Sequence, residues 1–110
     1  MALNLPFAYG QLVVVVLHSP RERIWGALLG LEGHGLALRG IDVAPWEEVL
    51  ALVRQGQADQ ISLSTRFVPM HRIESLYLDE RSSGVPSLAE VFMDRTGQAP
   101  MAFLMGEEER

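Results

Sequence analysis

The chain has 110 residues and a formal net charge of −5, and 48% of its residues are apolar. The length favours a single domain, 1–110, and the apolar content excludes an intrinsically disordered chain. The absence of cysteine excludes disulfides, thiol catalysis and thiolate metal sites, and it is compatible with the reducing cytoplasm, where we expect the protein.

Residues 1–10 form an arm that ends in a turn at Gly10, and residues 11–18 form the first predicted strand. Four consecutive valines favour extended structure because their branched side chains are stiff. Both faces of this strand are apolar, so both must be covered, since an exposed segment of this kind would template aggregation. The run is too short to cross a bilayer, and we expect no membrane partner.

Two further strands are predicted over residues 23–32 and 36–43, joined by a hairpin turn at Gly33-His34-Gly35. Gly26, Gly30 and Gly40 lie inside these strands. Glycine weakens a strand interior, so each should mark a tight bend or a close approach of two backbones.

Residues 45–55 change to the helical period, with one apolar stripe at i, i+3, i+4 and i+7. Pro45 suits the first helical position, and Gly56 suits the C-terminal cap. A helix is therefore inserted between the third and fourth strands, and its stripe consists of Trp46, Val49, Leu50 and Val53.

Residues 61–68 alternate with period two, which predicts a strand with one buried face. Ile61, Leu63, Thr65 and Phe67 share one face, and the residues between them share the other. Pro69 must end or bend this strand, and pairing resumes at Arg72. The two strands therefore cannot form an ordinary hairpin. They either turn a corner in a small barrel or lie as consecutive strands that cross nearly at right angles. The barrel spans residues 11–80.

Residues 81–110 form a connector, a helix and a tail. Ser87 with Glu90 makes a capping box, and the helix that it starts ends near Gly97. The apolar segment around Phe103 docks on a neighbouring chain or frays, and the acidic end at 107–109 is a solvated tail.

The middle of the chain, from about Gln11 to Asp79, resembles the Sm-like family of small five-stranded barrels. The first part of the likeness is Gly26-x-Leu28, then Glu32 before the hairpin turn and Leu38; the second part is the run FVPMHRIESL at 67–76. An SH3-like barrel of another kind fits the same pattern. The fold class is therefore mainly β with inserted helices, in a small five-stranded SH3-like or Sm-like barrel. The resemblance implies a barrel and a ring of subunits.

The departures from that family concern its RNA site. RNA-binding members carry an acidic residue followed by an asparagine near the second hairpin, and here Gly35-Leu36 stands at the asparagine position. They also carry an arginine–glycine pair between the last two strands, where this chain has Pro69-Met70. The typical N-terminal helix is not evident. The resemblance therefore does not carry the RNA site over.

No constellation of nucleophile, base and oxyanion donor is present, so we expect no enzyme. The histidines His18, His34 and His71 are far apart in sequence. His71 and Glu74, three apart on a strand, would point to opposite faces, so we predict no metal site and no cofactor. Trp25, Phe67 and Tyr77 could stack on bases, but a core or subunit contact is favoured by the negative charge of the chain.

Two functions follow. The first is a non-catalytic structural or interaction module that forms a homo-oligomer, since two strands carry more apolar surface than one small barrel can hide. Its predicted interface is Val13, Val14, Val15, Val16, Phe67, Ile73, Leu76, Tyr77 and Leu78. The alternative is an RNA- or other nucleic-acid-binding Sm-like protein, which the scattered arginines disfavour. Its predicted contacts are Glu32, His34, Arg66, His71 and Arg72.

Overall fold

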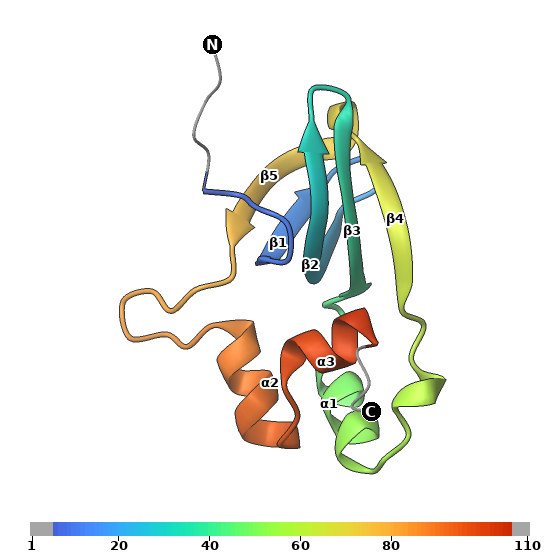
Figure 1. Ribbon diagram of the computed structural model, residues 1–110, viewed down its shortest axis with the longest axis vertical. Helices are drawn as coiled ribbons and strands as arrows, with labels where there is room; N and C mark the ends of the chain where they lie inside the picture. The colour runs from blue at the N-terminus through green and yellow to red at the C-terminus, as the bar shows by residue number, and fades with distance from the viewer. Residues whose placement is uncertain (1–5, 107–110) are drawn as a thin grey trace.

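The computed structural model describes residues 6–106, so the first half of the predicted arm and the acidic tail at 107–110 lie outside the described residues. Five antiparallel strands form one sheet in the order β4-β3-β2-β1-β5, with the helices gathered at one end of it (Figure 1). The strands are β1 (Leu12–Leu17), β2 (Glu22–Glu32), β3 (Gly35–Asp42), β4 (Ser64–Pro69) and β5 (Ile73–Leu78).

The predicted helix at 45–55 and the predicted capping-box helix are both confirmed. The helical elements are α1 (Trp46–Arg54), η1 (Ala58–Gln60), η2 (Met70–Arg72), α2 (Leu88–Thr96) and α3 (Pro100–Met105). The apolar segment near the C-terminus, predicted to dock on a neighbour or fray, is the helix α3, which buries Phe103 and Leu104 in its own chain. Within residues 6–106 no helix has the length and apolar character needed to cross a bilayer.

The prediction of five strands is confirmed, and the prediction that they close into a barrel is wrong. Within the described residues β4 and β5 are the two edges of the sheet and do not pair with each other. They diverge from the short corner η2, which places them on opposite sides of an open, curved sheet (Figure 1). The proline corner thus prevents a hairpin, as predicted, without closing the sheet.

One face of the sheet is the inner face of the curve. Alternate residues of every strand meet there, and both edge strands contribute to it. Its buried residues are Val13, Val15, Leu17, Ile24, Leu28, Leu36, Leu38 and Val68, and Ile73, Leu76 and Leu78 of β5 pack against them half-buried. The curvature therefore lets one apolar cluster hold both edges without hydrogen bonds between them.

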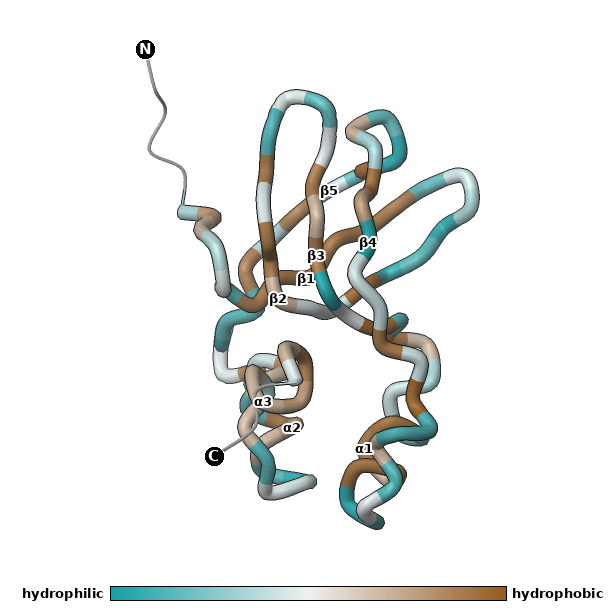
Figure 2. Tube along the Cα trace, turned by 45° about the vertical axis from the view of Figure 1, so that its right-hand side comes forward, coloured by the Kyte–Doolittle hydropathy of each residue, from teal (hydrophilic) through white to brown (hydrophobic). Residues whose placement is uncertain are grey.

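The opposite face is covered by the helices at one end of the sheet. Val14, Trp25 and Ile41 of the central strands meet α1, α2 and α3 in a second cluster. Phe92 lies within it, with its ring centre 5.5 Å from that of Trp25 and 5.1 Å from that of Phe103. All three helices lie at this end of the sheet and contain hydrophobic segments (Figure 2), and residues of each belong to this cluster. Both faces of β1 are thus covered, as the sequence requires.

Residues 61–68 do not form the strand with one buried face that their alternation predicts. Strand β4 begins only at Ser64, and Ile61 and Leu63 pack against the helix cluster before it starts. Phe67 follows them on the same face but lies beyond the reach of the helices and is 55% exposed, whereas Val68 is buried in the inner cluster. Both faces of this segment are therefore used, each over part of its length.

Asp79 joins the sheet to α2. Its carboxylate accepts a hydrogen bond from Trp25 Nε1 at 2.9 Å and from the backbone N–H groups of Leu88 and Ala89, each at 2.8 Å. The Ser87 hydroxyl accepts from the Glu90 N–H and completes the capping box. These bonds satisfy donors at the start of α2 that have no partner within the helix.

We expect Asp79→Ala to lower the free energy of unfolding by about 3 kcal/mol, because it leaves the indole N–H of fully buried Trp25 and two helix donors without their acceptor. Glu80→Ala removes the neighbouring carboxylate and should change the free energy of unfolding by less than about 0.5 kcal/mol. Urea denaturation of the two variants measures the difference. Equal midpoints would show that Asp79 does not hold the sheet to α2.

Candidate functional site

The open edge of β4 presents backbone groups that its own sheet does not use. Met70 donates its N–H to the His34 carbonyl at 2.8 Å, which continues the register in which Leu36 pairs with Val68 and Leu38 with Arg66. Hydrogen-bonded pairs alternate along an antiparallel ladder. The N–H and C=O groups of Thr65 and Phe67 therefore point away from β3, into the space beyond the sheet.

The same reasoning applies to β5. Asp79 donates its N–H to the Leu12 carbonyl at 2.9 Å, in register with the pair of Val14 and Tyr77. By the same alternation, Leu76 and Leu78 turn their backbone groups to the open edge. The two edges thus each carry a short row of unsatisfied donors and acceptors, which is the template by which another strand pairs.

Exposed apolar side chains accompany these edges. Phe67 on β4 is 55% exposed, Tyr77 on β5 is 44% exposed, and Met70 in the corner between them is 41% exposed. Ile73, Leu76 and Leu78 of the predicted interface are half-buried along β5. The part of that predicted interface that lies on the edge strands is therefore accessible to a second chain.

The part of the predicted interface on β1 is not accessible. Val13, Val14, Val15 and Val16 are at most 5% exposed, and β1 lies between β2 and β5. The excess of apolar surface was inferred for a small barrel alone, but the helices α1, α2 and α3 of the same chain cover the second face of this strand. These four valines belong to the core and are removed from the interface.

Arg66 and Arg72, two of the predicted nucleic-acid contacts, meet at one carboxylate. Arg66 Nη1 lies 3.2 Å from Glu22 Oε1, and Arg72 Nη2 lies 3.4 Å from Glu22 Oε2. Arg72 also donates to the carbonyls of His18 at 3.1 Å and Pro20 at 2.7 Å, which fixes the turn between β1 and β2. The two guanidinium groups are thus engaged in holding β4 and η2 to the start of β2.

Burial raises the pKa of Glu22, but the hydrogen bonds and positive charges of Arg66 and Arg72 outweigh it and hold that pKa below its ordinary value of 4.5. A lowered pKa in the folded state stabilises the fold above pH 4.5, and this contribution is lost as the pH falls through the lowered value.

We therefore expect Glu22→Gln to lower the free energy of unfolding by about 1 to 2 kcal/mol at pH 7. The penalty should shrink as the pH falls below 4.5, where Glu22 is protonated in the unfolded chain, and should be lost once the pH passes the lowered pKa of the folded chain. Glu74→Gln removes the exposed partner of Arg21, at 3.4 Å, and should have little effect. Urea midpoints measured from pH 7 to pH 3 test this, and a penalty that does not depend on pH would contradict it.

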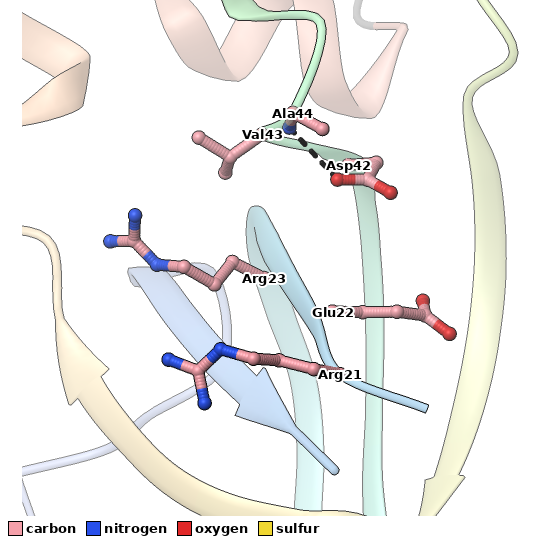
Figure 3. A pocket seen from close by; sticks show the side chains of 6 residues that line it. All are labelled: Arg21, Glu22, Arg23, Asp42, Val43 and Ala44. Atoms are coloured by element: carbon pink, nitrogen blue, oxygen red, sulfur yellow. Dashed lines mark hydrogen bonds between the residues drawn. The ribbon is translucent and has the colours of Figure 1, made fainter. Parts of the chain in front are cut away.

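A hollow of about 280 Å³ lies beside this network, between the start of β2 and the end of β3. Arg21 and Arg23 extend to one side of it, while the carboxylates of Glu22 and Asp42 point to the other (Figure 3). The Ala44 N–H donates to Asp42 at 2.9 Å. Glu22 lies between Arg21 and Arg23 in the sequence, and Glu74 forms an ion pair with Arg21. The hollow therefore does not form a concentrated positive surface of the kind that binds nucleic acid.

The remaining predicted contacts gather near the second hairpin. His34 Nδ1 lies 3.5 Å from Glu32 Oε1, and the His34 carbonyl is bound by Met70, next to exposed His71. These groups are solvent-exposed, and among residues 6–106 no three His, Cys, Asp or Glu side chains lie together in a way that could hold a metal ion. Sequence analysis did not identify Glu22, although the alternating charges of Arg21-Glu22-Arg23 place it on the face opposite to its neighbours.

Comparisons of the chain with protein-family models, with curated proteins and with solved structures gave no match.

Proposed function

We propose that this protein is a non-catalytic Sm-like interaction module that assembles with copies of itself through the edge strands β4 and β5. The observation that carries the proposal is the pair of open edges, each with unsatisfied backbone groups and an exposed aromatic side chain, Phe67 on one and Tyr77 on the other. Edge strands of this kind are covered in most proteins, because uncovered ones template aggregation.

Several features support an Sm-like module in particular. The chain has five strands, a helix inserted between β3 and β4, and a corner at Pro69 and η2 between the last two strands. The residues that carry the resemblance, Gly26-x-Leu28, Glu32, Leu38 and the run at 67–76, lie in β2, in β3 and in the segment from β4 through η2 to β5.

The two open edges permit a ring. The strands β4 and β5 are different surfaces of one chain, so pairing of β4 with the β5 of the next copy is a head-to-tail contact. Contacts of this type form closed rings when the rotation between copies closes, and open fibres when it does not. Pairing in this way would satisfy the outward backbone groups of both edges in every copy.

Light scattering coupled to size exclusion tests the proposal with the full chain. We expect a discrete mass that is a multiple of the 12.2 kDa chain at micromolar concentration. A monomer at every concentration up to about 100 μM would overturn the proposal, because specific strand pairing between copies of a stable homo-oligomer is tighter than this. A polydisperse, growing mass would indicate fibres and would overturn the ring.

A further inference from the structure

One carboxylate of β2 connects the two edge strands. Glu22 accepts a hydrogen bond from Arg66 of β4 at 3.2 Å and another from Arg72 of the corner η2 at 3.4 Å. Each arginine binds a different oxygen of the carboxylate, Oε1 for Arg66 and Oε2 for Arg72. Arg72 directly precedes β5, which begins at Ile73. Glu22 therefore joins β4 and the start of β5 to the same point of the sheet.

This contact lies on the inner face of the curved sheet. Glu22 is paired with Leu17 in the ladder of β1 and β2, and Arg66 is paired with Leu38 in the ladder of β3 and β4. Paired residues of a ladder point to the same face of the sheet, and both leucines belong to the inner apolar cluster. The ion pair of Glu22 with Arg66 thus crosses the inner face beside that cluster.

The angle between β4 and β5 depends on the curvature of the three strands between them. Among residues 6–106, β4 is paired with β3 alone and β5 with β1 alone, so no ladder joins the two edges. Apolar contacts hold the inner face together but are non-directional. Hydrogen bonds from a planar guanidinium group to a carboxylate are directional. The contact at Glu22 therefore restricts the curvature in a way that the apolar cluster does not.

The orientation of the corner is fixed as well. Arg72 also donates to the carbonyls of His18 at 3.1 Å and Pro20 at 2.7 Å, and its own carbonyl accepts from the His18 N–H at 3.0 Å. The corner η2 is thus bound to the turn between β1 and β2, next to Glu22. The remaining freedom lies in β4, and Arg66 is the residue of β4 that binds this carboxylate.

We propose that the contact of Glu22 with Arg66 and Arg72 sets the angle between the two edge strands and thereby the number of copies in the assembly. This inference rests on the proposed assembly through β4 and β5. In a head-to-tail contact, the rotation from one copy to the next follows from the relative orientation of the two surfaces on each chain, and this rotation decides whether a ring closes. Glu22 is a positioning residue, since it lies in β2 and not on either edge.

The test measures the masses formed by Glu22→Gln, with light scattering coupled to size exclusion at a concentration at which the parent chain is assembled. The amide has nearly the size of the carboxylate and leaves both edges unchanged, but its hydrogen bonds to the arginines are weaker because it carries no charge. We expect the copies still to pair, with the single mass of the parent replaced by several masses.

Glu47→Gln is the matched control, because it removes the same charge and also breaks an ion pair with an arginine. Glu47 Oε1 lies 2.7 Å from Arg95 Nη2, between α1 and α2 and away from both edges. This variant should keep the mass of the parent. Arg66→Gln is a second test, since it releases β4 and leaves Arg72 on Glu22, and it should give several masses as Glu22→Gln does. Circular dichroism checks that each variant folds.

The outcomes separate this inference from the proposed assembly. The single mass of the parent in either Glu22→Gln or Arg66→Gln would overturn the inference and leave the assembly standing. Several masses in Glu47→Gln, or a monomeric Glu22→Gln chain, would also overturn it, because the effect would then come from charge or from pairing itself. A monomeric parent chain would overturn the assembly and the inference together.

Discussion

Gly26→Ala should lower the free energy of unfolding by about 3 kcal/mol or more, although it adds only one methyl group. Gly26 lies directly opposite Gly40 in the antiparallel pairing of β2 with β3. A Cβ atom at Gly26 would lie 2.7 Å from Gly40 Cα and 2.9 Å from the Arg39 carbonyl carbon, and it would also collide with the Arg39 oxygen. These are backbone atoms, so the strands themselves would have to separate.

Gly30→Ala is the matched control, since Gly30 lies in the same strand and a Cβ atom there would meet nothing within 4 Å. We expect it to be neutral or to stabilise the fold by up to about 1 kcal/mol, through the reduced freedom of the unfolded chain. Urea denaturation compares the two variants. If both unfolded at the same midpoint, the close approach of β2 and β3 would not be the reason for glycine at position 26.

Thr65→Pro should abolish assembly at concentrations at which the parent chain is fully oligomeric. We expect it to weaken the affinity between copies about a hundredfold or more, where each factor of ten corresponds to about 1.4 kcal/mol of binding free energy. The N–H of Thr65 points to the open edge, so proline removes a donor that only a neighbouring strand would use. The fold of the single chain should persist, because proline is tolerated on edge strands when the missing N–H faces outward.

Thr65→Ala is the control for this variant. Both substitutions remove the 3.3 Å contact between Arg39 Nη1 and the Thr65 hydroxyl, but alanine keeps the backbone N–H. Light scattering should therefore find the alanine variant assembled and the proline variant monomeric, with similar circular dichroism. Assembly of Thr65→Pro at the parent concentration would mean that β4 is not the contact.

The strands and helices could be predicted because their signals are local. The valine run, the glycine turn and the capping box at Ser87 act over a few residues, and the structure has β1, the hairpin at 33–34 and α2 at those places. The geometric reason expected for the glycines holds for Gly26 and Gly40, which meet at a close approach, and Gly30 lies at the irregularity in the pairing of β2 with β3.

The nature of the cover over β1 could not be predicted. An apolar second face shows that Val14 must be buried, but the same pattern results whether helices of the same chain or another subunit cover it. Burial of the apolar side of α3 against Trp25 and its neighbours depends on a contact distant in sequence. Periodicity over a few residues carries no information about such a contact.

The role of the arginines was also beyond local reasoning. Arg66 and Arg72 meet Glu22, which lies 44 and 50 residues away in sequence. Their charge suggested nucleic-acid contacts because the partner carboxylate could not be identified before the curvature of the sheet was known. The same curvature explains why Phe67 is exposed while its neighbour Val68 is buried.

Amide hydrogen exchange at the two edges tests the assembly most directly. The N–H groups of Thr65, Phe67, Leu76 and Leu78 face outward in the single chain, so they should exchange rapidly in dilute solution. They should become protected together as the concentration rises and the scattering mass increases. Rapid exchange of these four amides in a fully assembled sample would contradict pairing through β4 and β5.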